Sequence, residues 1–260
     1  MLIIGERLSV VSRKVREAIL KKDKKPIHEI ATEQWKAGAH MIEANIGPAE
    51  DDGEGVMEWM VTTIQEVVPL PVSLDTTNSK AMEAGLKVHN NQWGKPLINS
   101  TSLDPERFVM FELSAKYSVP IIALTVGKSG LPRDAEERVE IAVQLIEKAV
   151  EFGVSLEDVY LDPLVLQIST SQEQAKEVLR AIKLFQQLND PPMKTIVGLS
   201  NISNGCPKHL RPILNKYFFA LLMYEGLNAA IANPAEIIEV VKTISIINGK
   251  TLYAHSYLEI

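Results

Sequence analysis

Four short apolar runs of this 260-residue sequence each end in a carboxylate or an amide. Asp75 closes the run PVSLDTT, Asn99 lies in LINST, Asp162 lies in VYLDPL, and Ser200 with Asn201 closes KTIVGLSN. Carboxylates accept hydrogen bonds, whereas an amide both donates and accepts them. This set suits a heterocycle with an amino-pyrimidinone edge. If the fold gathers the four positions, they predict a binding site for such a ring.

A simpler interpretation is that Asp75 and Asn99 only cap the helices that follow them, because acidic and amide side chains are favoured at helix N-caps. For either residue alone this interpretation is the better one. Four such positions after four apolar runs favour a shared site instead.

The segment after Asn201 contains Cys206 and His209. A catalytic thiol needs an activating base, and no Ser-His-Asp arrangement occurs in a recognisable context. The five histidines are scattered and Cys206 is the only cysteine, so neither a metal site nor an intrachain disulfide is expected.

Apolar runs and helical patterns alternate along the whole chain. Strands are expected over residues 2–5, 41–46, 71–77, 97–100, 120–126, 159–164, 195–200 and 229–232. Helices are expected over residues 12–22, 27–37, 56–67 and 78–89, from 104 onward, and over 134–152, 172–188, 211–224 and 234–247. This alternation implies parallel strands joined by crossover helices.

Eight such units close a barrel more naturally than they form an open sheet. We therefore predict an α/β fold, a (β/α)8 TIM barrel, with residues 1–260 forming a single domain. The site would then lie at the carboxyl ends of the strands. A doubly wound sheet is the alternative, but the phosphate-loop patterns GxGxxG and GxxxxGK[ST] that it often carries are absent.

Composition excludes several classes of protein. A formal net charge of -6 argues against general affinity for nucleic acid. No apolar run reaches about 18 residues, and the N-terminus lacks the pattern of a signal peptide, so no membrane span is expected. The expectation is a soluble cytoplasmic protein.

Six short motifs strengthen the ligand prediction, because they occur in one fixed order. They are GER at 5–7, EANIGP at 43–48, LDTTN at 74–78, INST at 98–101, LDP at 161–163 and GLSNIS at 198–203. The ordered set resembles the pterin-binding methyltransferase family. It is most similar to methyltetrahydrofolate:corrinoid/iron–sulfur protein methyltransferases and to the tetrahydrofolate methyltransferase components of corrinoid-dependent O-demethylation systems in anaerobes. The resemblance to the folate module of cobalamin-dependent methionine synthase is more distant.

The resemblance implies a TIM barrel, usually a homodimer, that binds a pterin in its mouth. Asp75, Asn99 and Asp162 match the family's pterin-binding residues, and Asn201 matches the asparagine that approaches N5. Gly198 and Ser200 fall beside the pterin, and Arg211 corresponds to an arginine near the ring. Two positions depart from the pattern, since Ser9 replaces an asparagine and Glu43 replaces a frequent aspartate.

The activity that the resemblance implies is transfer of a methyl group between N5 of tetrahydrofolate and the cobalt of a corrinoid. The substrate is tetrahydrofolate or 5-methyltetrahydrofolate. No DxHxxG segment, the usual signature of a cobalamin domain, occurs in this chain, so a partner corrinoid protein would supply the corrinoid. Two alternatives remain open: a dihydropteroate synthase, and a folate-binding subunit without chemistry of its own.

Overall fold

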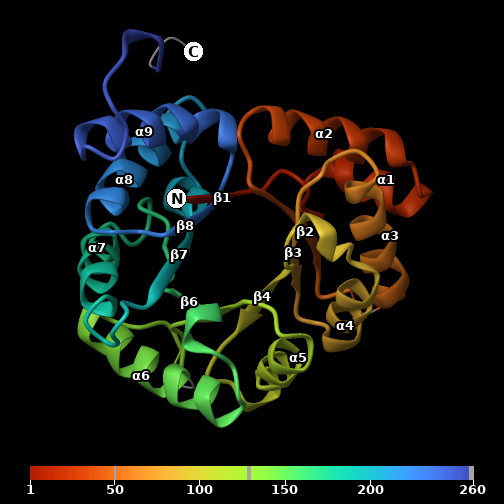
Figure 1. Cartoon of the computed structure of the whole chain (residues 1–260), viewed down its shortest axis with the longest axis horizontal. Helices are drawn as coiled ribbons and strands as arrows, with labels where there is room; N and C mark the ends of the chain where they lie inside the picture. Colours follow the sequence, from red (N-terminus) through yellow and green to blue (C-terminus); the bar gives the residue numbers. More distant parts are fainter. Residues whose placement is uncertain (50, 128–129, 258–260) are drawn as a thin grey trace.

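The strands form one closed parallel barrel in the computed structural model, which describes residues 1–49, 51–127 and 130–257. The strands are β1 (Leu2–Gly5), β2 (Met41–Gly47), β3 (Val72–Thr76), β4 (Leu97–Thr101), β5 (Ile121–Leu124), β6 (Val159–Asp162), β7 (Lys194–Gly198) and β8 (Ala229–Ala232). Each strand pairs with the next, and β8 pairs with β1 to close the ring. The helices surround this ring (Figure 1). The predicted (β/α)8 barrel is confirmed.

The helices follow the strands in alternation. They are α1 (Arg13–Lys21), α2 (Lys24–Lys36), α3 (Gly53–Gln65), α4 (Ser79–Val88), α5 (Val109–Tyr117), α6 (Ala135–Glu151), α7 (Gln174–Phe185), α8 (Arg211–Tyr224) and α9 (Pro234–Ile247). Short 3-10 turns are η1 (Asn91–Trp93), η2 (Pro105–Arg107), η3 (Leu156–Asp158), η4 (Leu199–Ser203) and η5 (His255–Tyr257). Within the described residues, no helix combines the length and the apolar character needed to cross a bilayer.

The boundary between the first two helices differs from the prediction. Residues 23–26 were expected to separate them, but α2 begins at Lys24 and takes Pro26 into its first turn. Asp23 is the N-cap, and its carboxylate accepts a hydrogen bond from the backbone N–H of Lys25 over 3.1 Å. Proline lacks an N–H, but first-turn N–H groups have no partner within the helix, so Pro26 fits there.

Side chains inside the barrel explain why one end is filled and the other can bind a ligand. Leu97, Ile122 and Ile196 are buried in one apolar cluster contributed by β4, β5 and β7. Because successive side chains of a strand point to opposite faces, Asn99 points the same way as Leu97, one step nearer the carboxyl end. The barrel floor is therefore mostly apolar, with the buried Ser73 of β3 beside Leu97, and the carboxylates and amides gather toward the mouth.

Candidate functional site

A cavity of about 370 Å³ lies at the carboxyl ends of the strands. This volume falls in the range of small-molecule sites, which are about 300–1,000 Å³. Its lining residues come from the ends of β1 to β8 and the loops that follow: Glu6, Ser9, Glu43, Asn45, Asp75, Asn99, Leu124, Asp162, Leu164, Val165, Gly198, Ser200, Asn201 and Ile231. Six of the seven residues that the sequence singled out therefore line one cavity.

The β2–β3 register holds Asp75 in place. Asn45 and Asp75 are partners across this strand pair, and the Asn45 side-chain amide donates a short hydrogen bond to Asp75 Oδ2. Asn45 Oδ1 in turn accepts from the backbone N–H of Gly47 over 3.1 Å. Both polar atoms of the Asn45 amide are therefore hydrogen-bonded. Asp75 faces the cavity with its Oδ2 atom already bonded to Asn45.

Glu43 and Asn99 meet inside the mouth. Asn99 Nδ2 donates to Glu43 Oε1 over 3.2 Å, although the two residues come from β2 and β4. Asp75 lies on the strand between them and is the register partner of Asn99. Glu43 is buried, so its longer side chain, at the position where the resemblance expected aspartate, reaches into the interior rather than to solvent.

Asp162 is the most enclosed of the predicted acids, with 7% of its surface exposed. Its Oδ1 accepts from the backbone N–H of Leu164 over 2.8 Å. Leu164 has a left-handed φ of 62°, which turns the chain back over the carboxylate. The Asp162 carbonyl accepts from Thr125 Oγ1 over 2.9 Å, so the residue after β5 is joined to the end of β6.

The loop after β7 carries the remaining predicted residues. β7 ends at Gly198, so Ser200 lies in η4 rather than on the strand as expected, and Asn201 lies in η4 as well. Ser200 Oγ donates to Glu6 Oε1 over 2.6 Å, which ties η4 to the end of β1. A Cβ atom on Gly198 would lie 3.1 Å from Asn201 Nδ2, so glycine at this position leaves room for the Asn201 amide.

Four carboxyl groups share this mouth, and burial raises the pKa of each. Loss of hydration raises the pKa of Asp75 to about 6 and the pKa values of Glu6 and Asp162 to about 7. It also raises the pKa of Glu43 well above its ordinary value, and the charges of Asp75 and Glu6 raise it further. Near neutral pH the cavity can therefore offer both ionised acceptors and protonated donors.

Two arginines behind the cavity act on these acids from outside it. The Arg107 charge lowers the pKa of Asp75 against the effect of burial, and the Arg138 charge does the same for Asp162. Arg138 is fully buried and donates to the carbonyl of Pro163 over 2.6 Å and to Gln174 Oε1 over 2.8 Å. Each arginine thus braces the backbone beside a site carboxylate.

Arg211 is not among the residues that line this cavity. It is the first residue of α8, and its Nε donates to the carbonyl of Cys206 over 2.9 Å. The bond braces the loop between η4 and α8. Cys206 and His209 are also absent from the lining residues.

The helix-capping interpretation of Asp75 and Asn99 is wrong. Asn78 caps α4, where its side chain accepts from the backbone N–H groups of Lys80 and Ala81. Asp104 caps η2 in the same manner. Asp75 and Asn99 are therefore free of that task and face the cavity.

Several lining residues were not chosen from the sequence as site residues. Glu6 directly follows β1, and its place after an apolar run is the same signal that selected Asp75. Asn45 also stands at the end of a strand. In contrast, Leu124, Val165 and Ile231 look like ordinary core residues in the sequence, and only the closed barrel places them at the mouth.

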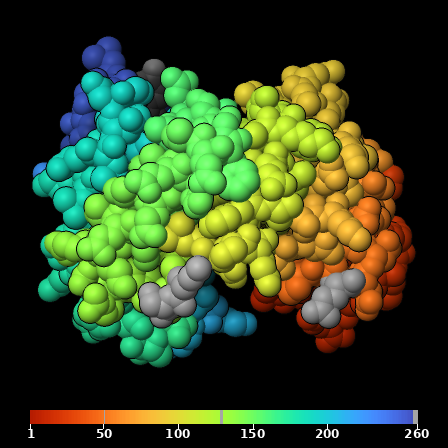
Figure 2. Space-filling model, turned by 90° about the horizontal axis from the view of Figure 1, so that it is seen from below, coloured from red at the N-terminus to blue at the C-terminus, as the bar shows by residue number. Residues whose placement is uncertain are grey.

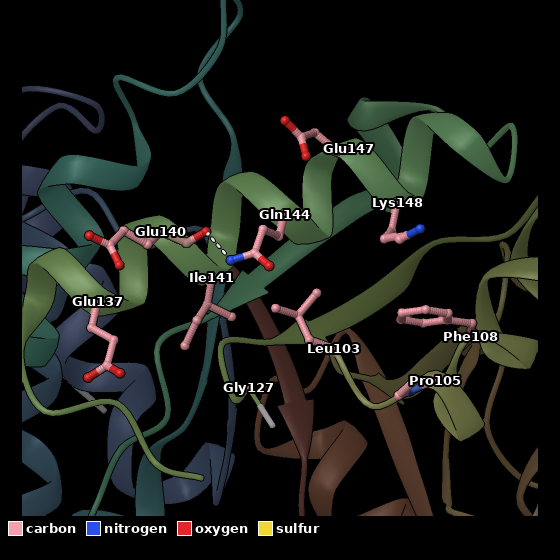
Figure 3. Close-up of a pocket in the computed structure, with 10 residues that line it drawn as sticks. All are labelled: Leu103, Pro105, Phe108, Gly127, Glu137, Glu140, Ile141, Gln144, Glu147 and Lys148. Carbon is pink, nitrogen blue, oxygen red and sulfur yellow. Dashed lines mark hydrogen bonds between the residues drawn. The ribbon is translucent and has the colours of Figure 1, made fainter. Parts of the chain in front are cut away.

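A larger hollow of about 690 Å³ lies on the outer wall, between α6 and the segment around η2 (Figure 3). This side of the molecule faces the reader in Figure 2. The hollow is lined partly by charged residues of α6 that have partners on or beside the same helix, such as Glu137 with Arg133 and Lys148 with Glu151. It lacks the convergence of buried polar groups seen at the barrel mouth, so we assign the site to the mouth.

Comparison with known proteins agrees with the geometry. The family model described as "Pterin binding enzyme" matches residues 6–233. The chain belongs to this pterin-binding enzyme family. The matched region begins at Glu6 and includes every other residue that lines the mouth.

Named relatives fall into two groups. The chain is 32% identical over 251 residues to a methionine synthase of Mycobacterium leprae and 31% identical over 250 residues to that of Mycobacterium tuberculosis. These matches cover 92% of this chain but only 21% of each relative. The chain is also 29% identical over 238 residues to the methylcorrinoid:tetrahydrofolate methyltransferase of Eubacterium limosum, which covers 90% of this chain and 85% of that protein.

Proposed function

We propose that this protein transfers a methyl group between N5 of tetrahydrofolate and the cobalt of a corrinoid carried by another protein. The observation that carries the proposal is the convergence of Asp75, Asn99 and Asp162 in one cavity that Asn201 also lines. The name of the Eubacterium limosum relative, which matches over most of its length, supports the same reaction.

The donor and acceptor groups of the mouth fit a pterin ring. The amino-pyrimidinone edge of a pterin presents N–H groups. The ionised carboxylates of Asp75 and Asp162 can accept hydrogen bonds from these groups. Asn99 can both donate to and accept from the same edge. Leu124 and Ile231 supply apolar surface in the same cavity. The ring would be held in a fixed orientation, which favours in-line transfer of the methyl group.

Asn201 has the chemistry needed at the reacting atom. A methyl group on a neutral tertiary amine leaves poorly, so N5 must gain positive character in the transition state. A hydrogen bond between the Asn201 amide and N5 would stabilise the protonated, charge-developing form. Gly198 and the Ser200–Glu6 bond keep η4, and with it Asn201, in position.

The corrinoid, when bound to its carrier protein at the open mouth, supplies the cobalt that accepts or donates the methyl group. Asn201 is exposed, so the edge of the mouth that bears it is open to a second protein. The name of the Eubacterium limosum relative includes a methylcorrinoid, which supports a corrinoid as the second reactant.

A dihydropteroate synthase would use the same barrel and a similar pterin pocket. It would also need an early asparagine and a Ser/Arg-rich site for a diphosphate. Of the opening segment, Glu6 and Ser9 line the mouth and no asparagine does, and among residues 1–49, 51–127 and 130–257 no lysine or arginine belongs to the lining. This donor set fits methyl transfer better than displacement of a diphosphate.

We extend the proposal to a homodimer, because α8 exposes an apolar stripe suited to self-pairing. Tyr217 is 68% exposed and lies at the centre of this stripe. Exposed Ile213 and Leu221 stand four residues to either side, and exposed Leu210 and Tyr224 stand seven residues to either side. A two-fold axis at Tyr217 would therefore place Ile213 against Leu221 of the second copy, as a self-complementary interface requires.

Charge also favours an antiparallel pairing of α8 with its copy. Lys208 and Arg211 stand near the start of the helix, and Glu225 directly follows its end. An antiparallel second copy would bring opposite charges together at both ends of the contact.

Adding a reduced corrinoid distinguishes the candidate functions. Chemically reduced cobalamin and 5-methyltetrahydrofolate are mixed with the protein, and the corrinoid absorbance spectrum is followed, with the reverse reaction run from methylcobalamin and tetrahydrofolate. Transfer in either direction supports the proposal. Pterin binding without transfer, also when a corrinoid protein replaces free cobalamin, would identify a folate-binding subunit. Condensation of a pterin diphosphate with an aromatic amine would identify a dihydropteroate synthase.

A further inference from the structure

Arg107 connects the two strands that carry Asp75 and Asn99. It lies in η2, and its Nη1 donates to the carbonyl of Thr77 over 2.8 Å, just past the end of β3. Its Nη2 donates a short hydrogen bond to the carbonyl of Ser100, the residue after Asn99. One guanidinium therefore fixes the distance between the ends of β3 and β4.

The loop that carries Arg107 is itself braced. The Arg107 carbonyl accepts from Thr101 Oγ1 over 2.9 Å, and its backbone N–H donates to the Asp104 carbonyl over 2.8 Å. The side chain is partly buried rather than free in solvent. The arginine guanidinium is planar and carries several N–H donors in fixed geometry, so it can donate to two carbonyls at the same time.

Arg107 does not line the cavity, and within the described residues it forms no salt bridge with Asp75 at 4.0 Å or less. Its side-chain hydrogen bonds go to backbone carbonyls rather than to a carboxylate, and its positive charge interacts with both Asp75 and Asp104. The other groups near Asp75 are Glu43 and Asn45 from β2 and Asn99 from β4.

The remaining charges around this set do not replace Arg107. Glu6, from the end of β1, acts on Glu43, and Asp104 is a second acid whose charge acts on Arg107. Of the charged groups that act on Asp75, Arg107 is the cation, and its charge opposes the increase in pKa caused by burial. Removing it would leave a buried carboxyl beside another acid.

We propose that Arg107 is a positioning residue for the pterin: it holds the ends of β3 and β4 at a fixed separation and supplies the positive charge that keeps Asp75 an acceptor. The proposal rests on the pterin site argued above. Arg107 acts through Asp75 and the backbone and does not touch the ligand.

The test measures the affinity for 5-methyltetrahydrofolate by calorimetry between pH 5 and pH 8. The proteins compared are the wild type, Arg107→Gln, Arg107→Lys and the control Arg180→Gln. Arg180 is an exposed arginine of α7 whose ion-pair partners, Glu136 and Glu177, lie on the outer helices. Wild-type affinity should fall as the pH drops through the pKa of Asp75, because the protonated acid accepts hydrogen bonds poorly.

Arg107→Gln should move the midpoint of this loss upward by about one pH unit, since a nearby opposite charge lowers the pKa of a carboxyl by roughly that amount or more. Its affinity should fall about tenfold at pH 5, below both midpoints, but only about twofold at pH 7, because a group that must be ionised loses a full factor of ten per pKa unit only below its pKa. Arg107→Lys keeps the charge and should return the midpoint to the wild-type value. Arg180→Gln should match the wild type throughout.

Different failures have different meanings. Absence of pterin binding by the wild type at every pH would overturn the proposed function. Wild-type binding with an unmoved midpoint in Arg107→Gln would overturn the positioning role, since a purely structural arginine would lower affinity equally at all pH values. Glu6, Glu43 and Asp162 titrate in both proteins, so the difference between the profiles reports on Arg107. If Arg107→Gln unfolds below the assay temperature, the test rests on Arg107→Lys. The proposal requires this variant to lose pterin affinity at the same midpoint pH as the wild type, and a shifted midpoint would overturn it.

Discussion

Residues that suit a ligand can oppose the stability of the free protein, and Asp162 illustrates this. Its folded-state pKa is raised to about 7 by burial. Because the folded protein favours the protonated form of Asp162, this carboxyl contributes to stability in full below its unfolded-state pKa of about 3.9. That contribution is lost as the pH rises through about 7. Glu6 and Asp75 are shifted in the same direction.

Asp162→Asn should therefore stabilise the ligand-free protein at pH 8. The asparagine Oδ1 can still accept from the Leu164 N–H, but no charge is buried. The melting temperature should increase by at least a few degrees, since about 1 kcal/mol corresponds to roughly 2–4 °C in a chain of this size. Differential scanning calorimetry at pH 5 and pH 8 checks this result. The variant should also show a smaller difference between the two pH values than the wild type.

The same substitution should weaken binding of tetrahydrofolate, because an amide cannot replace an ionised carboxylate as acceptor of two N–H groups. Loss of a charged hydrogen bond at a buried site costs roughly 1.5–3 kcal/mol. A variant that was both less stable at pH 8 and unchanged in affinity would contradict the role of Asp162 in the site.

Gly198→Ala tests the space around Asn201. Its φ of -79° is open to alanine, but the added Cβ would lie 3.1 Å from Asn201 Nδ2. Displacing a reacting group by a fraction of an ångström can cost on the order of tenfold in rate. We expect slower methyl transfer with a nearly unchanged melting temperature. Equal transfer rates for the variant and the wild type would remove the proposed constraint on Asn201.

At the level of helices and strands, the order of elements was predictable because each strand is a short apolar run bounded by turn residues. The ranges predicted for α8, α9, β1 and β8 coincide with the observed ones. The sequence did not predict that β7 stops at Gly198 and that Asn201 sits in a 3-10 turn. The alternation of apolar and polar residues does not distinguish the last residues of a strand from the turn that follows it.

The site was predictable where a polar residue interrupts an apolar run, as at Asp75, Asn99 and Asp162. It was not predictable where contacts join distant segments. The bonds from Asn45 to Asp75 and from Asn99 to Glu43 follow from the strand register, which only the closed barrel defines. The apolar wall residue Ile231 gives no sequence signal at all.

Packing between elements gives a prediction of its own at Gly85 in α4. A Cβ there would lie 2.6 Å from Met57 Cγ in α3 and 3.1 Å from Leu74 Cδ1 in β3. Gly85→Ala should destabilise the protein by about 1–3 kcal/mol through overpacking, despite the better helix propensity of alanine. Thermal melting checks this, and an increase in melting temperature would show that the contact relaxes. Affinity for the pterin should persist, since none of these three residues lines the mouth.

At the scale of the whole molecule, the exposed stripe on α8 predicts a dimer. Light scattering after size-exclusion chromatography should give twice the chain mass for the wild type. Tyr217→Glu should give a monomer, because it places a charge on the proposed two-fold axis. The control is Tyr253→Glu, a change of an exposed tyrosine outside α8 that should leave the dimer intact. A monomeric wild type, or a dimeric Tyr217→Glu protein, would contradict this interface.

The proposed function connects these scales, because it requires the strands to position a pterin in the open barrel mouth with its N5 within reach of a partner protein. The measurement that tests this account most directly is single-turnover methyl transfer between 5-methyltetrahydrofolate and a reduced corrinoid protein, at saturating pterin, for the wild type and Asn201→Ala. The wild type should transfer the methyl group, and Asn201→Ala should be slower by on the order of a hundredfold while binding the pterin with nearly wild-type affinity. Absence of transfer by the wild type, or an equal rate in Asn201→Ala, would contradict the account.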